Sequence, residues 1–220
     1  MKSIGNDIVA LNAIDIQRSN NPAFYSKFVT DAELALYRQK CISKLPLAHF
    51  VWLLWSVKES AYKYLKRTDE QLLFAPVKII VHSLDSPPKP ITSFHSNEEI
   101  DDDGFYSGQV VYGADRLFFR TKITEQFIAT IACDEQLFNN VHWAVNTIDD
   151  ISTTNQSTAV REFALKNIRA ITKYEHPQIV KTAAGVPVIF NGDKQSKIPI
   201  SLAHHGHFIS YAFYHSSLKV

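Results

Sequence analysis

The sequence predicts an α+β protein made of two similar strand–helix–strands units that form a pseudo-dimer. Strand-like and helix-like segments follow one another in both halves of the chain. SVKESAYK (56–63) matches AVREFALK (159–166) at an offset of 103 residues, and FIATIAC (127–133) matches FISYAFY (208–214) at an offset of 81 residues. The two offsets differ by 22, the length of the polar, Pro-rich segment 83–104. We interpret that segment as an exposed insertion in the first unit.

The first unit opens with SIGNDIVAL (3–11), whose β-prone composition predicts a strand. Thr30 followed three residues later by Glu33 is the pattern of a capping box, and it predicts the start of a helix. A second helix is predicted over 46–67, because apolar residues recur there at intervals of three and four: Leu54, Val57, Ala61 and Leu65. Further strands are predicted at VKIIV (77–81), GQVVY, LFFRT and FIATIAC.

The second unit is predicted over 139–220, after a first unit of 1–138. VHWAVNTI (141–148) is strand-like, and a helix is predicted from about 158 to 174. Its apolar stripe repeats that of the first unit at the same offset: Val160, Ala164 and Ile168. The predicted closing strands are VPVIF, IPISL and FISYAFY.

Composition excludes several classes of function. The 220 residues carry a formal net charge of +1, so no bulk field attracts nucleic acid or an anionic membrane. Two cysteines, Cys41 and Cys133, give neither a disulfide framework nor a metal–cysteine cluster, which favours the cytoplasm. Neither a signal peptide nor an apolar run of the roughly 20 residues that span a bilayer occurs in the sequence. Any phosphate site must use side chains or a metal, because no glycine-rich phosphate loop is present.

Polar residues in three segments are the candidates for a site. Glu59 and Lys63 lie four residues apart on one helix face, where the ordinary alternative is an exposed ion pair. Asp7 interrupts the first strand, where a turn or a cap is the alternative. The sequence AHHGHF near the end is poor as a metal site, because adjacent histidines on a strand point to opposite faces. Two carboxylates without cysteine suit a hard cation such as Mg²⁺.

Four segments together resemble a known family. IGNDIV, FVTDAE, WSVKESAYK and SLAHHGHFISYAF, in this order and apolar context, resemble the 4′-phosphopantetheinyl transferases. The resemblance implies an α+β unit that larger members carry as a fused pair, so we expect a monomer acting as a pseudo-dimer. It also implies an enzyme that transfers 4′-phosphopantetheine from coenzyme A to a serine of an acyl or peptidyl carrier protein.

The resemblance also implies roles for individual residues. Asp7 and Glu59 would bind Mg²⁺, or Mn²⁺, against the pyrophosphate of coenzyme A. Glu59 and Lys63 would be catalytic, and Lys63 would contact the phosphates and stabilise the leaving adenosine 3′,5′-bisphosphate. Lys58, the other basic residue of the motif, would lie toward the phosphates.

At the other end of the chain, His204 and Gly206 match the family's S-H-x-G segment. The resemblance implies that this segment belongs to the coenzyme A site and that His204 reaches the 3′-phosphate from the second unit.

Three positions depart from the family pattern. Val9 stands where many two-domain members have a further carboxylate, Ala203 replaces a serine, and Val186 replaces the lysine of a G-K-P segment. These residues favour the alternative of a non-catalytic module that binds coenzyme A or a carrier protein. A structural protein with a solvated helix face is a third reading.

The two copies of the unit are predicted to be unequal. Glu162 and Lys166 duplicate Glu59 and Lys63, but the second unit has apolar residues around Val145 where the first has Asp7. We therefore expect the second pair to be a relic and the two half-sites to make one complete site.

Overall fold

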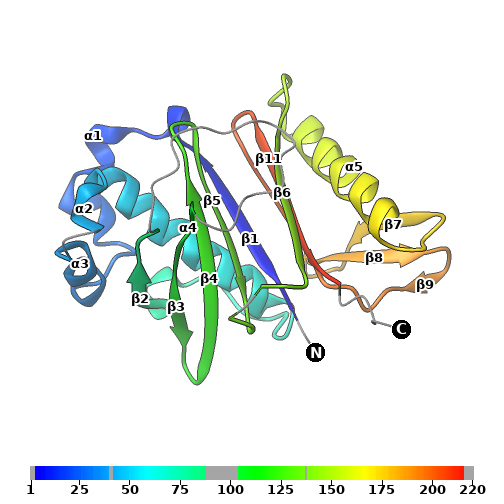
Figure 1. Ribbon diagram of the computed structural model, residues 1–220, viewed down its shortest axis with the longest axis horizontal. Coiled ribbons are helices and arrows are strands. Elements are labelled where there is room, and N and C mark those ends of the chain that lie inside the picture. The colour runs from blue at the N-terminus through cyan, green and yellow to red at the C-terminus, as the bar shows by residue number, and fades with distance from the viewer. Residues whose placement is uncertain (1–2, 40–41, 88–103, 137, 216–220) are drawn as a thin grey trace.

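The computed structural model describes residues 3–39, 42–87, 104–136 and 138–215, and it has the α+β fold that the sequence predicts. Figure 1 shows two groups of elements that meet along β1 and β11. The helices are α1 (Ile16–Ser19), α2 (Pro22–Tyr25), α3 (Asp31–Tyr37), α4 (Leu47–Lys66) and α5 (Thr153–Ile171). No helix in these parts of the chain has both the length and the apolar composition needed to cross a membrane.

The first unit is an antiparallel sheet in the order β1-β5-β4-β3-β2, with α4 packed across one face. Its strands are β1 (Gly5–Ala10), β2 (Ile80–Asp85), β3 (Tyr106–Tyr112), β4 (Asp115–Ile123) and β5 (Phe127–Cys133). The predicted apolar stripe of α4 is buried, with Val57 and Leu54 fully enclosed, since it faces this sheet. The α3 helix begins at the predicted capping box, in which Thr30 and Glu33 bond to each other's backbone.

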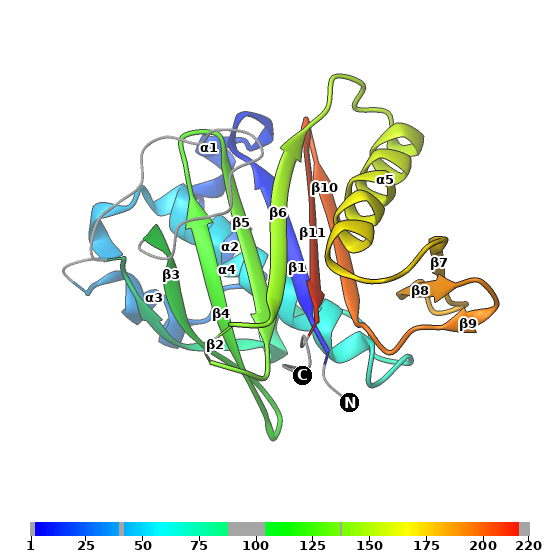
Figure 2. The same cartoon turned by 45° about the vertical axis from the view of Figure 1, so that its right-hand side comes forward.

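The second unit pairs β6-β11-β10 in one antiparallel sheet and β7-β8-β9 in another. Its strands are β6 (Val141–Thr147), β7 (Pro177–Lys181), β8 (Pro187–Asn191), β9 (Lys194–Gln195), β10 (Ile200–His205) and β11 (Phe208–Tyr214). The α5 helix starts at the Ser152 cap, and its predicted stripe of Val160, Ala164 and Ile168 is buried. Figure 2 shows α5 lying over the β6-β11-β10 sheet.

The two units share part of their topology. In the first, β1 pairs with β5 and β5 with β4; in the second, β6 pairs with β11 and β11 with β10. The matching strands β5 and β11 have the bounds of the repeated segments, and every residue of both is buried. This order is what a duplicated unit predicts, and the duplication itself stays a prediction.

We call the boundary between β1 and the strands β10 and β11 the joint. Across it, the Asn6 backbone N–H donates to Ser201 Oγ (3.0 Å), and the Asn6 side chain donates to Ser210 Oγ (3.1 Å). The Ala10 backbone N–H donates to His205 Nδ1 (3.0 Å). Side chains therefore replace the backbone ladder that would join two neighbouring strands, and these bonds fix the second unit against the first.

The structure corrects several predicted boundaries. Residues 76–78 form a 3-10 turn, and β2 begins only at Ile80, because the carbonyls of Pro76 and Ile79 accept from the buried Lys58 instead of from a neighbouring strand. The second long helix begins at Thr153, earlier than predicted, because Ser152 caps it. The short elements α1, α2, β7 and β9 were not predicted, and most of the segment 83–104 lies outside the described residues.

Candidate functional site

The site begins with a close approach between β1 and α4, which depends on Gly5. A Cβ atom at Gly5 would lie 1.8 Å from the backbone oxygen of Ser60, so only glycine allows this spacing. The approach brings Asp7, two residues along the strand, against the polar face of α4. Glycine at position 5 thus allows the close packing that places the Asp7 carboxylate against α4.

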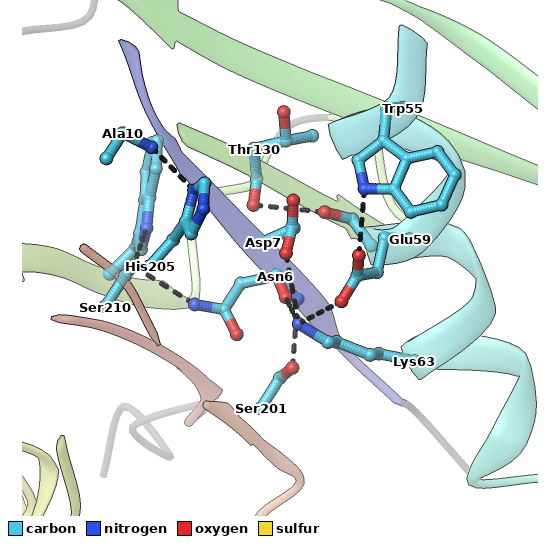
Figure 3. Close-up of polar contacts among 12 residues, drawn as sticks. Asn6, Asp7, Ala10, Trp55, Glu59, Lys63, Thr130, Ser201, His205 and Ser210 are labelled. Carbon is cyan, nitrogen blue, oxygen red and sulfur yellow. Dashed lines mark hydrogen bonds and ion pairs between the residues drawn. The ribbon is translucent and has the colours of Figure 1, made fainter. Parts of the chain in front are cut away.

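Asp7, Glu59 and Lys63 meet at this contact (Figure 3). Lys63 Nζ lies 3.3 Å from Asp7 Oδ1 and 3.3 Å from Glu59 Oε1, and it donates to the Asn6 carbonyl at 2.9 Å. Burial disfavours the charge on Lys63, but the two carboxylates outweigh this effect and raise its pKa. The lysine therefore stays protonated between two acids, and the predicted pair on one helix face becomes a cluster of three groups.

Asp7 has an unused oxygen. Its Oδ2 is buried and has no hydrogen-bond partner among the described residues. Burial raises the pKa of Asp7 to about 7; Lys63 opposes this rise and Glu59 adds to it. A buried carboxylate with a free oxygen is unfavourable unless a cation or proton satisfies it.

These two acids fit the metal that the resemblance implies. Asp7 offers a free buried oxygen, and Glu59 is about a third exposed beside it. In the described chain no group of three or more His, Cys, Asp or Glu side chains gathers around a common point. Carboxylate oxygens are hard ligands, so this pair would suit Mg²⁺ better than a softer ion.

Trp55 holds the Glu59 carboxylate in place. Its indole N–H donates to Glu59 Oε2 at 3.1 Å (Figure 3). The ring packs edge-on against Phe28 and Phe74, so the donor itself is fixed. Trp55 also lines an aromatic cavity together with Trp52. Trp55 therefore connects the Glu59 carboxylate to the wall of this cavity.

On the other side of the cluster lies a basic cavity of about 240 Å³, shared by the two units. None of its described lining residues is acidic. Its cationic and histidine side chains are Lys63, Lys66 and Arg67 from α4 and its end, and Arg161, Lys181 and His204 from the second unit. Such a concentration of positive charge in one hollow suits a ligand with several phosphates.

Sequence reasoning found only Lys63 and His204 of this set. Arg161 is held in position by two bonds of 2.8 Å from its guanidinium to Ser157, one to the carbonyl and one to the hydroxyl. The repeat offered a signal, because Arg161 matches Lys58 at the offset of 103 residues. Lys66 and Lys181 have no distinguishing sequence pattern.

The two adjacent histidines point in different directions, as the strand pattern predicts. His204 lines the basic cavity, where partial loss of solvent contact together with the nearby cations, Lys63 first, lowers its pKa. His205 faces β1 and accepts from Ala10, and burial lowers its pKa also. Gly206 forms the turn after them with a φ of 57°, and its carbonyl accepts from Gln156 at 2.8 Å. Gly206 therefore shapes the turn beside the joint rather than lining the basic cavity.

The prediction that Lys58 lies toward the phosphates is wrong. Its side chain is fully buried, and Nζ lies 2.7 Å from Glu33 Oε1. It also donates to the carbonyls of Pro76 (2.9 Å) and Ile79 (2.7 Å). All three ammonium donors are thus used to tie α3 and the start of β2 to α4, and none remains for a ligand.

The three departures from the family pattern have different surroundings. Val186 lines the basic cavity, so the position of the missing lysine does face the ligand space. Ala203 is buried in the joint among Ile8 and Phe208 and does not line the cavity. Val9 is buried against Leu11 and Ile128.

The pKa of Asp7 predicts how Mg²⁺ binding depends on pH. Below about pH 7 Asp7 is protonated in the metal-free protein, and a proton must leave before the carboxylate can bind a cation. We expect added Mg²⁺ to raise the unfolding temperature clearly at pH 8 and much less at pH 6. Asp7→Asn should abolish the Mg²⁺ effect at both pH values, whereas the exposed Asp193→Asn should preserve it. An equal Mg²⁺ effect at the two pH values would show that Asp7 does not bind the ion.

The same pKa shift predicts the stability of the metal-free protein. The folded-state value lies above the unfolded value, so Asp7 takes up a proton on folding between about pH 4 and pH 7. Stability should therefore fall as pH rises through this window, and Asp7→Asn should remove that part of the pH dependence. Urea titrations at pH 5 and pH 8 without divalent cations measure the free energy of unfolding. If this free energy changes between the two pH values as much in Asp7→Asn as in the wild type, the prediction is contradicted.

Comparison with known proteins gives one positive result. A model of the 4′-phosphopantetheinyl transferase superfamily matches residues 3–115, just over half of the chain. A comparison with curated proteins found no significant match. The matched region holds β1 and α4, and so the whole Asp7–Glu59–Lys63 cluster. This match supports phosphopantetheinyl transfer as the general activity and confirms the resemblance. The segments IGNDIV, FVTDAE and WSVKESAYK lie within the matched region, and SLAHHGHFISYAF (201–213) lies outside it. The chain belongs to the 4′-phosphopantetheinyl transferase superfamily.

Proposed function

We propose that the protein transfers 4′-phosphopantetheine from coenzyme A to a serine of an acyl or peptidyl carrier protein, in a reaction that requires Mg²⁺ and releases adenosine 3′,5′-bisphosphate. The observation that carries the proposal is the position of Lys63, which belongs both to the carboxylate cluster and to the basic cavity. A pyrophosphate at this point meets a metal-binding pair on one side and cations from both units on the other.

Asp7 and Glu59 would bind the metal, and bound Mg²⁺ would supply neutralisation of charge on the pyrophosphate oxygens. The cost of burying the Asp7 carboxylate, with its free Oδ2, is offset when a cation is present. Mn²⁺ takes the same oxygen ligands and would substitute.

Lys63 would stabilise the leaving group. Its raised pKa keeps it charged, and its side chain remains a quarter exposed, so the ammonium is accessible from the cavity. Phosphoryl-type transfer depends on positioning and charge neutralisation more than on covalent chemistry by the protein. Arg161 and Lys181, which belong to the second unit, would bind the other phosphate groups of coenzyme A.

The carrier serine would approach from the side of Glu59. The serine oxygen forms a bond to the phosphorus that carries the pantetheine arm. The bond between that phosphorus and the oxygen of the leaving adenosine 3′,5′-bisphosphate breaks. Glu59 would accept the serine proton, directly or through water. Trp55 supports this role, because its indole N–H fixes one Glu59 oxygen while the carboxylate stays partly exposed.

Mass spectrometry of a carrier protein tests the proposal. The protein is incubated with apo acyl or peptidyl carrier proteins, coenzyme A and Mg²⁺, and the mass of each carrier protein is then measured. We expect one carrier class to gain one phosphopantetheine, and the gain to disappear with excess chelator. If coenzyme A binds but no carrier gains mass with Mg²⁺ or Mn²⁺, the chain is instead a non-catalytic binding module, which Val186 in the cavity favours.

His204 provides a prediction about ligand discrimination. We propose that it contacts the 3′-phosphate, which coenzyme A has and dephospho-coenzyme A lacks. His204→Ala should weaken coenzyme A binding by about tenfold or more, the scale of a charge-assisted hydrogen bond, and leave dephospho-coenzyme A binding nearly unchanged. The preference for coenzyme A should grow as pH falls, because partial loss of solvent contact and then the nearby cations lower the pKa of His204, so that it becomes charged only at lower pH. Calorimetry measures the affinity for both ligands, and His176→Ala, at an exposed histidine, is the control. An equal loss of affinity for the two ligands in His204→Ala would contradict the role.

A further inference from the structure

Arg67, the C-cap residue of α4, reaches from the first unit to the second. Its Nη2 donates to the backbone carbonyl of Pro187 at 2.9 Å and also to that of Ile200. These carbonyls belong to β8 and β10 of the second unit. One side chain of the first unit therefore holds two strands of the second, at the wall of the basic cavity.

The charge on Arg67 is not balanced. Its Nε is buried and has no hydrogen-bond partner among the described residues. No carboxylate within the described chain forms an ion pair with it, and burial lowers its pKa to about 10. Backbone carbonyls supply only partial negative charge, and removing a cation from water without an anion is costly.

The surroundings make the imbalance larger. Lys66 on the same helix and Lys181 on β7 line the same cavity, without an acid among the described lining residues. These like charges come from both units and repel one another in a partly enclosed space. A bound anion with several charges would attract the cations of both units, so that net repulsion between the units becomes net attraction.

We propose that Arg67 is a positioning residue that couples occupation of the basic cavity by a nucleoside bisphosphate anion to the packing of the second unit against β1. The inference rests on the proposed function for the ligand class, and adds that the ligand stabilises the joint through Arg67. Without the anion, the hydrogen bonds of Arg67 to Pro187 and Ile200 are opposed by repulsion among the cations. With it, the phosphates supply the missing counter-charge, and β10 with His204 is held firmly at the site.

The structure provides two reporters of joint opening. The amides of Asn6 and Ala10 donate to Ser201 and His205 across the joint, so they become free to exchange with solvent when the units separate. Ser201 lines the cavity, so a ligand can protect Asn6 directly. Ala10 is bonded at the other end of β10, by His205, and reports the joint itself.

The experiment measures hydrogen exchange of these two amides by NMR with and without adenosine 3′,5′-bisphosphate, after calorimetry has established saturation. We expect the nucleotide to slow exchange at both amides by about tenfold or more, and amides of β3 and β4 much less. Arg67→Met should weaken nucleotide binding by about tenfold and remove most of the protection of Ala10. The exposed Arg169→Met on α5 should change neither, and Arg67→Lys, which keeps the charge, should recover part of both.

Each outcome decides the inference. If the nucleotide binds but Ala10 exchange is unchanged, the coupling is wrong and the proposed function stands. If Arg67→Met lowers the unfolding temperature but binds the nucleotide as tightly as the wild type, Arg67 is only a structural clamp and the inference is overturned. If the wild type binds no nucleotide, both the inference and the proposed function fail. Should Arg67→Met not fold, Arg67→Lys and the wild-type exchange data decide the question.

Discussion

Glu59→Gln and Lys63→Ala are expected to lower turnover by roughly 10²-fold or more, the usual scale for removing a preorganised charge at a transition state. Each change removes one member of the cluster in which Lys63 lies 3.3 Å from both carboxylates. The folded state should survive, because both side chains are partly exposed. Initial rates of carrier modification at saturating coenzyme A measure the effect.

The duplicated helix offers matched controls. Glu162 and Lys166 occupy the equivalent places on α5, and both are exposed. The strand registers place Asp7 opposite Thr130 and Ala144 opposite Tyr211, so Ala144 is the counterpart of Asp7. With no carboxylate to complete a cluster, Glu162→Gln and Lys166→Ala should leave turnover within about twofold, as for exposed pairs generally. An equal loss from Lys166→Ala would mean that α5 takes part in catalysis.

Lys58→Met is expected to lower the free energy of unfolding by about 3–5 kcal/mol, because it leaves the buried Glu33 carboxylate without its cation. Glu33 also accepts from the backbone N–H of Val81, so the damage extends to β2. The Michaelis constant for coenzyme A should change little, since Lys58 does not reach the cavity. Urea denaturation and steady-state kinetics on the same preparation separate the two effects.

The neighbouring exposed Lys78→Met is the control for stability and should stay within about 0.5 kcal/mol. The double change Glu33→Leu with Lys58→Met should recover part of the loss, because it removes both buried charges together. A stable Lys58→Met protein with a greatly raised Michaelis constant would restore the original prediction that Lys58 binds phosphate.

The error over Lys58 has a physical source. Motif reading groups Lys58 with Glu59 and Lys63, but Lys58 lies four residues after Leu54 and three before Ala61, on the edge of the apolar stripe. Helical spacing alone therefore indicated burial. Its partner, Glu33, was recognised as a capping residue, but their pairing joins α3 to α4 and is a tertiary contact that no local pattern encodes.

The long elements were predictable because their signals are local. The capping box at Thr30 and the periodicity of α4 each involve residues a few positions apart, and both were found. The basic cavity was not predictable, since its cations come from α4, α5 and β7 and meet only once β1 packs against β10. Arg67 and Lys181 individually look like ordinary exposed cations in the sequence.

The central claim is that each chain has one composite site, built by both units. Calorimetric titration with coenzyme A in the presence of Mg²⁺ tests it most directly, using the wild type, Lys63→Ala from the first unit and Lys181→Gln from the second. We predict one coenzyme A per chain, with affinity weakened by either change. Two equivalents per chain, or an affinity that Lys181→Gln leaves unchanged, would contradict it.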